Sequence, residues 1–219
     1  MNPARTLKIY GKPASRVFRV LWCASELGLD FELVPITSAD GSITSPEYLA
    51  INPNGKIPAM VDGSFVLLES QAIIFYLVRK YDSHHEKGLL PRTLEAEARA
   101  LQWSFWAMTE LDAPFVTVMF NRASLPRPER DPALADCAEA EMQAPLRILD
   151  TALAPSGYLA GDVFGLADLC VAGVLSWASE VGRLDLAAFP HVGAWLKACY
   201  DRPAAARVDP VRAMRAARS

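Results

Sequence analysis

A hydroxyl and two arginines stand where the first helix of the chain is predicted to begin. In YGKPASRVFRVLWCASELG, residues 10–28, Ser15 follows a short apolar strand, and Arg16 and Arg19 come within the next turn. The N-terminus of a helix exposes backbone N–H groups and attracts negative charge. Ser15 therefore has two interpretations: it caps this helix, or it helps to hold an anion there.

A proline at a strand entry is the second feature. NPNGKIPAMVDG, residues 52–63, places Pro58 where a strand begins. Since proline donates no hydrogen bond to a sheet, it belongs at an edge or an entry. A cis Ile57–Pro58 bond would leave the N–H and C=O of Ile57 outside the sheet, ready to pair with an extended peptide ligand. An ordinary turn proline is the alternative.

The third feature is a second transition from strand to helix, in ESQAI at residues 69–73. Ser70, together with the free N–H groups of the helix start, can bind a carboxylate, while Glu69 can accept a hydrogen bond from an ammonium group. The α-carboxylate and α-amino group of an amino acid match this pair. Ser70 as a plain cap is the alternative.

The elements that must position these residues form an α/β pattern. They are a strand over 6–10, a helix over 16–28, a strand over 31–36, a short helix from 46, a hairpin around 62–63 and a helix over 70–81. Helical spacing of apolar residues, the Asp62-Gly63 turn and Gly28 as a helix stop support these assignments. The order β-α-β-α-β-β-α predicts a small α/β domain over residues 1–82.

From residue 83 the pattern becomes helical throughout. Residues 83–93 are polar and contain Gly88 and Pro91, as is typical of a linker. Apolar periodicity then predicts helices at roughly 94–121, 132–153, 166–180, 190–200 and 203–208, with a surface helix starting at Asp209 in the tail. We therefore expect an all-α domain over residues 94–219.

Composition excludes several classes of protein. The chain has 219 residues, of which 52% are hydrophobic and 21% charged, as expected for a folded globular protein. A net charge of −3 gives no reason to expect a nucleic-acid partner. No apolar run reaches the ~18 residues of a membrane span, so no membrane partner is expected. MNPARTLKIYG lacks an apolar signal region, which makes the cytoplasm the expected location.

Cysteine and histidine placement argues against a metal or a disulfide framework. The four cysteines are far apart, each lies in an apolar helical setting, and each is expected to be a small buried hydrophobe: Cys23, Cys137, Cys170 and Cys199. The three histidines offer no plausible metal constellation with those thiols: His84, His85 and His191. No metal is therefore expected.

In order and spacing, the three features resemble those of cytosolic glutathione transferases of the serine type. Within that type, the resemblance is to theta-like and phi-like bacterial members. NPNGKIPAMVDG…LLESQAIIFYL is similar to that family's glutathione-site signature, and YLAGDVFGLADLCVAG (158–173) resembles its buried capping motif. The resemblance covers nearly all of the chain. It implies a thioredoxin-like N-terminal domain followed by an all-α helical-bundle C-terminal domain, a homodimer, and glutathione as co-substrate.

Carried over to this sequence, the resemblance implies a catalytic role for Ser15. Its hydroxyl would donate a hydrogen bond to the glutathione sulfur and stay protonated, and the Ser15 to Arg19 spacing is similar to that of theta-like sequences. A donor at a helix N-terminus lowers the thiol pKa and so enriches the nucleophilic thiolate. Arg16 could add to this field, although a solvated arginine is an equal alternative.

The same resemblance implies the glutathione-binding residues. Ile57, before cis-Pro58, would pair with the cysteinyl unit, and Glu69 and Ser70 would hold the γ-glutamyl end. Lys56 is a candidate for the glycyl carboxylate.

Two departures from the family pattern affect the expected site and fold. Phi-like members carry a histidine and a basic residue where this chain has Ile43 and Thr44, so the glycyl contacts are expected to differ. Gly165 replaces the usual Ser or Thr cap, with Asp168 retained three residues later. Since glycine is a tolerated cap, a modest loss of stability is expected.

A candidate electrophile pocket lies in WSFWAMTELDAPFVTVMF, residues 103–120. The resemblance implies that this long helix faces the glutathione sulfur, so Trp106, Met108 and Phe115 could line a pocket for an apolar substrate. Residues at such spacing also serve as core or dimer packing, which is the alternative.

The predicted function is addition or substitution by the glutathione thiolate on small, hydrophobic electrophiles. A hydrolase triad is unsupported because no histidine is placed to act as a base for Ser15. A glutathione-dependent isomerase or dehalogenase is an alternative within the enzymes. A non-catalytic binding or assembly module is an alternative from another class, which the intact Ser15 and Glu69-Ser70 pair weigh against.

Overall fold

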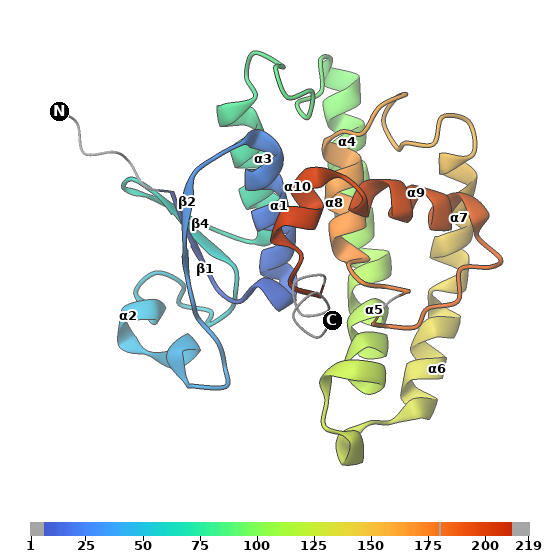
Figure 1. The fold of residues 1–219 in the computed structure, drawn as a ribbon, viewed down its shortest axis with the longest axis horizontal. Helices are drawn as coiled ribbons and strands as arrows, with labels where there is room; N and C mark the ends of the chain where they lie inside the picture. Colours follow the sequence, from blue (N-terminus) through green and yellow to red (C-terminus); the bar gives the residue numbers. More distant parts are fainter. Residues whose placement is uncertain (1–6, 180, 212–219) are drawn as a thin grey trace. The chain divides into compact units, whose positions relative to one another are not determined.

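The structure is a computed structural model that describes residues 7–179 and 181–211 (Figure 1). Two compact units account for these residues. The first comprises residues 7–90 and 202–211, and the second comprises residues 91–201 apart from residue 180.

The first unit is built on a mixed four-stranded sheet. Its elements are β1 (Leu7–Tyr10), α1 (Phe18–Leu27), β2 (Phe31–Val34), α2 (Pro46–Leu49), β3 (Ala59–Asp62), β4 (Phe65–Leu68), α3 (Ser70–Tyr81) and α10 (Pro203–Val208). The strand order is β2-β1-β3-β4. Strand β1 pairs in parallel with β2 and antiparallel with β3, and β4 closes the edge as a hairpin with β3. This arrangement confirms the predicted thioredoxin-like α/β fold.

Each face of the sheet is covered by different helices. Helices α1 and α3 pack together on one face, while α2 lies on the other (Figure 1). In β1, the buried Leu7 and Ile9 alternate with the half-buried Lys8 and Tyr10. Tyr10 packs with Tyr48 of α2 in a small second cluster. The period of two thus directs Leu7 and Ile9 to one face of the sheet and Tyr10 to the cluster on the other.

Helix α10 groups with the first unit. The guanidinium of Arg202 donates to both carboxylate oxygens of Glu26, at 2.6 and 2.8 Å, and Trp22 Nε1 donates to the same carboxylate at 2.9 Å. The sequence-based division assigned residues 94–219 to one helical domain, so the two groupings differ in this last helix. The predicted division into domains at residues 1–82 and 94–219, joined by a linker at 83–93, stays a prediction. Most of the predicted helix after Asp209 lies outside the described residues.

The second unit is all-α over its described residues. Its helices are α4 (Leu94–Trp106), α5 (Asp112–Met119), α6 (Pro132–Glu141), α7 (Gln143–Leu153), α8 (Leu166–Val174) and α9 (Pro190–Tyr200). The helix predicted over 94–121 contains a wide turn at Ala107–Leu111 between α4 and α5. The helix predicted over 132–153 is divided at Met142, because Pro145 lacks the N–H that an uninterrupted helix needs. The helix predicted over 166–180 ends at Val174.

A buried carboxylate fixes the start of α8. Asp168 accepts hydrogen bonds from the N–H groups of Gly165 and Leu159, each at 3.0 Å, and from Trp195 Nε1 at 2.9 Å. Burial raises the pKa of Asp168, and these three donors oppose that rise. The missing Ser or Thr side chain at Gly165 is thus offset by Asp168, which ties α8 to α9.

Three of the four cysteines are buried as predicted, namely Cys23, Cys170 and Cys199. The prediction was wrong for Cys137, which is exposed on α6 because it does not lie on the buried stripe of that helix, the side with Ala135 and Ala138. Within the described residues, no three His, Cys, Asp or Glu side chains are grouped as metal ligands, and no helix is long and apolar enough to span a bilayer.

Candidate active site

Ser15 lies in the turn that leads from β1 into α1. Its backbone is extended, with φ −161° and ψ −169°, just before the regular helix. The hydroxyl accepts a hydrogen bond from the N–H of Val17 at 3.1 Å and donates one to the carbonyl of Lys12 at 2.7 Å. Ser15 therefore acts as a cap of α1, and the one hydrogen of its hydroxyl is directed at a neighbouring carbonyl.

Gly11 allows this turn to approach a second loop closely. A Cβ at Gly11 would lie 2.4 Å from Cγ2 of Val17 and 3.0 Å from Cβ of Ile57. The φ of Gly11 is +132°, in the region that favours glycine. The end of β1 thus lies between the start of α1 and the Ile57 side chain, which brings Ser15 and Ile57 into one neighbourhood.

The Ile57–Pro58 bond is cis, as predicted. Among the described residues, neither the N–H nor the C=O of the Ile57 backbone takes part in a hydrogen bond. Pro58 is buried, Ile57 is half-buried, and the side chain of Lys56 is exposed.

Two buried residues that the sequence analysis missed hold this loop. The hydroxyl of Tyr48 and the amide of Asn52 both donate to the carbonyl of Lys56, at 2.5 and 2.6 Å. Burial raises the pKa of Tyr48, which keeps its hydroxyl protonated as a donor. Asn52 also accepts from the N–H of Asn54 at 3.1 Å, and this turn is a signal that NPNG carries in the sequence.

At the start of α3, Glu69 adopts an unusual backbone conformation. Its φ is +67° and its ψ is 116°, and its side chain is exposed. A positive φ at a residue with a Cβ costs about 1–3 kcal/mol and occurs preferentially at functional sites. Glu69 is the residue directly before the first turn of α3, and its side chain makes no hydrogen bond to the N–H groups of that turn.

A buried arginine joins the two helix starts. Arg19 of α1 is 3% exposed and Ser70 of α3 is 4% exposed, and the Arg19 guanidinium donates to the Ser70 hydroxyl at 3.4 Å. The N-termini of the two helices create a positive potential that suits an anionic ligand. Gly11 and Arg19 thus connect Ser15, Ile57 and Ser70, three residues that the sequence predicted separately.

The predicted electrophile-pocket residues lie in the second unit. Trp106 and Met108 are half-buried, and the ring of Trp106 meets that of Trp103 edge-on at a centroid distance of 5.1 Å. Phe115 is 4% exposed, which favours packing for this residue. A pocket lined by Trp106, Met108 and Phe115 stays a prediction.

Comparison with known proteins identifies the family. The family model for the glutathione S-transferase N-terminal domain matches residues 5–79, and that for the C-terminal domain matches residues 106–203. The chain belongs to the glutathione S-transferase family. It is 38% identical to glutathione S-transferase 3 of Zea mays over 207 residues, which are 90% of each chain.

Two further similarities bear on the site. A crystal structure of the theta class glutathione S-transferase of Xanthomonas axonopodis pv. citri, with glutathione bound, superposes with a TM-score of 0.86 at 30% identity and covers 94% of this chain and 98% of that one. The disulfide-bond oxidoreductase YfcG of Escherichia coli is 32% identical and covers 90% of this chain and 92% of its own.

Proposed function

We propose that this protein activates the thiol of glutathione and transfers the resulting thiolate to small, hydrophobic electrophiles. The observation that carries the proposal is the Ser15 hydroxyl at the start of α1, bonded to Val17, whose side chain and that of Ile57 both lie close to Gly11. Membership of the glutathione S-transferase family supports it.

Glutathione would lie along three groups of the first unit. The Ile57 backbone, which has no partner among the described residues, would pair with the cysteinyl unit as a strand pairs with a sheet edge. The γ-glutamyl carboxylate would meet Ser70 and the first N–H groups of α3, and its ammonium group would meet Glu69. Lys56 would approach the glycyl carboxylate from the exposed loop.

The chemical step needs sulfur in its thiolate form. Free thiols of ordinary pKa are only a few per cent ionised at pH 7. A hydroxyl donor and a helix N-terminus that together lower this pKa by about 2 units supply ~2.7 kcal/mol. The thiol proton passes to water, the thiolate attacks the electrophilic carbon, and a leaving group such as halide departs with its electron pair.

Ser15 acts in this scheme as a donor and never as a nucleophile. Its hydrogen is directed at the Lys12 carbonyl, so it must rotate toward the sulfur when the thiolate forms. The oxygen keeps its bond from the Val17 N–H during this rotation. The hydroxyl thus exchanges the neutral Lys12 carbonyl for the charged thiolate as its acceptor. Because hydrogen bonds to charged groups are stronger than those to neutral groups, this exchange is favourable.

The similarity to the YfcG oxidoreductase favours disulfide reduction as a second candidate. Position 15 holds a serine, and the first unit's Cys23 is buried. Any such reaction would therefore run between two glutathione molecules and the substrate, with one disulfide reduced and one glutathione disulfide formed.

Parallel assays distinguish these functions. Conjugation is followed with glutathione and 1-chloro-2,4-dinitrobenzene, and disulfide reduction with glutathione and 2-hydroxyethyl disulfide. We expect turnover in the first assay that falls in Ser15→Ala and is retained in Thr93→Ala, a cap variant in the second unit. Activity in the second assay alone would favour the oxidoreductase, and glutathione binding without turnover would favour a binding module.

A further inference from the structure

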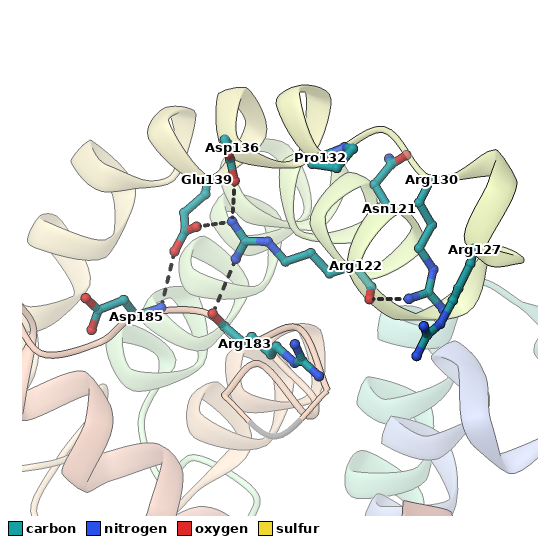
Figure 2. Close-up of a pocket in the computed structure, with 9 residues that line it drawn as sticks. All are labelled: Asn121, Arg122, Arg127, Arg130, Pro132, Asp136, Glu139, Arg183 and Asp185. Atoms are coloured by element: carbon teal, nitrogen blue, oxygen red, sulfur yellow. Dashed lines mark hydrogen bonds and ion pairs between the residues drawn. The ribbon is translucent and has the colours of Figure 1, made fainter.

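The second unit contains a polar cavity that the proposed function does not use. Its volume is about 670 Å³, and it is formed by the chain between α5 and α6, by α6 and by residues 183–185 (Figure 2). Four arginines, three carboxylates, one asparagine and one proline line it. Eight of these nine residues carry charged or polar groups, so the cavity offers ion-pair and hydrogen-bond partners to a polar ligand.

Two of the four arginines build the walls. Arg122 pairs with Asp136 at 3.0 Å and with Glu139, and it donates to the carbonyls of Gly182 and Arg183, each at 3.3 Å. Although burial opposes the charge, these carboxylates raise the pKa of Arg122 further above its ordinary value. Its charge is therefore already balanced inside the protein.

Arg130 has a similar structural role. Its guanidinium donates to the carbonyls of Leu125, Arg122 and Ala123 at 2.8, 2.9 and 2.6 Å. These carbonyls belong to the end of the helical segment that follows α5, where the helix dipole is negative. Arg130 thus caps a helix C-terminus and fixes the turn that precedes α6.

The remaining two, Arg127 and Arg183, present their charge to the cavity. Both side chains are exposed, and neither makes an ion pair or a side-chain hydrogen bond within the described residues. Figure 2 shows the two side chains extending from opposite sides of the cavity, one from the turn before α6 and one from the segment before α9. They are the groups with charge available for a ligand.

Both of these arginines are held by stiff backbone. Arg127 stands between Pro126 and Pro128, which restrict the turn. Arg183 adopts a φ of +52°, and Arg122 holds this conformation through the carbonyls of Gly182 and Arg183. A positive φ at a residue with a Cβ must be maintained by its surroundings. The points from which the two side chains extend are therefore fixed by the backbone, and the exposed guanidinium groups can adjust to a ligand.

We propose that this cavity binds a small phosphorylated polyol. The planar guanidinium forks of Arg127 and Arg183 match the oxygens of a phosphate group. The carboxylate of Asp136, which is exposed and pairs with Arg122, can accept further hydrogen bonds from hydroxyl groups and would repel a second anionic group. The volume lies within the usual range of small-molecule sites. Phosphate at one end and hydroxyls at the other satisfy both sets of side chains.

Calorimetric titration of the full-length protein tests this proposal. The probe is glucose 6-phosphate, in a phosphate-free buffer that holds saturating glutathione so that binding at the glutathione site is excluded. Glucose and inorganic phosphate are titrated separately. The variants are Arg127→Gln, Arg183→Gln and the double variant, with the exposed Arg147→Gln on α7 as a control of equal charge change.

We expect glucose 6-phosphate to bind the wild type and Arg147→Gln equally, at least about tenfold more weakly to each single variant, and not measurably to the double variant. Inorganic phosphate should bind more weakly than the sugar phosphate, and glucose should not bind. Absence of binding to the wild type at 10 mM, on the order of the weakest relevant affinities, would overturn the proposal. So would equal binding by the double variant, and equal affinity for inorganic phosphate would overturn the polyol part.

Discussion

At the scale of single residues, Ser70 has two roles: it contacts Arg19 within the first unit, and it is expected to contact glutathione. Its hydroxyl meets the Arg19 guanidinium, and it stands where the γ-glutamyl carboxylate is expected. That end of glutathione is remote from the reacting sulfur, so the contact contributes equally to ground state and transition state. We expect Ser70→Ala to raise KM for glutathione roughly tenfold or more with kcat nearly unchanged. Steady-state kinetics check this, and a fall in kcat at constant KM would show that the ligand is misplaced.

Two separate features of position 11 require glycine: the positive φ of its backbone and the lack of space for a Cβ. In Gly11→Ala, the new Cβ would meet Val17 at 2.4 Å and also face a φ of +132°. Gly41 also has a positive φ, of +77°, but has no atom within 4 Å of the position a Cβ would take. Gly41→Ala should lose about 1 kcal/mol, and Gly11→Ala about 2–4 kcal/mol together with glutathione affinity. Urea denaturation measures both losses, and equal losses would contradict a close approach at Gly11.

At the scale of elements, two buried carboxylates tie helices in place with opposite pH dependence. Asp62 of β3 accepts from Tyr76, Lys80 and Tyr81 of α3. Although burial opposes ionisation, these bonds lower the pKa of Asp62. Its contribution to stability is therefore present above the unfolded value near 3.8 and is lost as the pH falls through the lowered value.

Asp168 at the start of α8 behaves in the opposite sense. Burial raises the pKa of Asp168 in the folded protein above its unfolded value of 3.8. The contribution of Asp168 to stability is therefore complete below pH 3.8 and declines as the pH rises through the raised pKa of the folded state. The stability difference between wild type and Asp62→Asn should thus widen with rising pH, and that for Asp168→Asn should narrow. Free energies of unfolding measured across the acid range check both signs, and parallel curves for wild type and both variants would contradict the account.

The sequence predicted an element correctly where a single local signal marked its end and no other signal indicated a different structure. Gly28 adopts the left-handed conformation at the end of α1, and Asp62-Gly63 joins β3 to β4, as the sequence indicated. The split at Met142 was missed because helical periodicity continues through it while Pro145 interrupts the hydrogen bonds. The end of α8 at Val174 was missed because apolar residues continue past it at Leu175, Trp177 and Ala178, whereas Trp177 adopts a positive φ of +61° that an α-helix does not contain.

The candidate site was predictable as parts but not as an assembly. Ser15, Ile57 and Ser70 each carry a local signal, a helix start or a strand entry. Gly11 and Tyr48 carry no such signal, and the sequence indicated Arg19 only by its spacing from Ser15 and not by its contact with Ser70. All three residues act through contacts between elements distant in sequence. Within one chain, such contacts appear only in the folded structure.

At the scale of the whole molecule, exposed apolar side chains favour association of two copies. Leu94, Leu101 and Phe105 follow one face of α4 and are 77%, 37% and 66% exposed. Phe65 and Val66 on the edge strand β4 are each 43% exposed. A two-fold homodimer in which the first unit of one copy meets the helical unit of the other would cover both groups.

Sedimentation at micromolar concentration tests the dimer. We expect a dimer for the wild type and a shift toward monomer of at least about tenfold in the dissociation constant for Phe105→Glu, because a charge would enter an apolar interface. Val163→Glu, at a loop residue that is 70% exposed, serves as the control and should stay dimeric. Wild-type monomer at these concentrations would rule out the interface.

The central claim is that Ser15 stabilises a thiolate rather than only capping α1. A cap alone would cost about 1 kcal/mol of stability on Ser15→Ala and leave the bound thiol unchanged. A thiolate donor would instead leave glutathione affinity nearly unchanged, raise the pKa of the bound thiol toward its value in water, and lower kcat at neutral pH by ~10- to 1000-fold.

Ultraviolet absorbance of the thiolate in the binary glutathione complex, titrated against pH, tests this claim most directly. Wild type and Thr93→Ala, which loses only the cap of α4, should share a midpoint about 2 pH units below that of free glutathione. Ser15→Ala should titrate close to free glutathione. Coincident curves for wild type and Ser15→Ala would contradict the account and leave Ser15 as a helix cap.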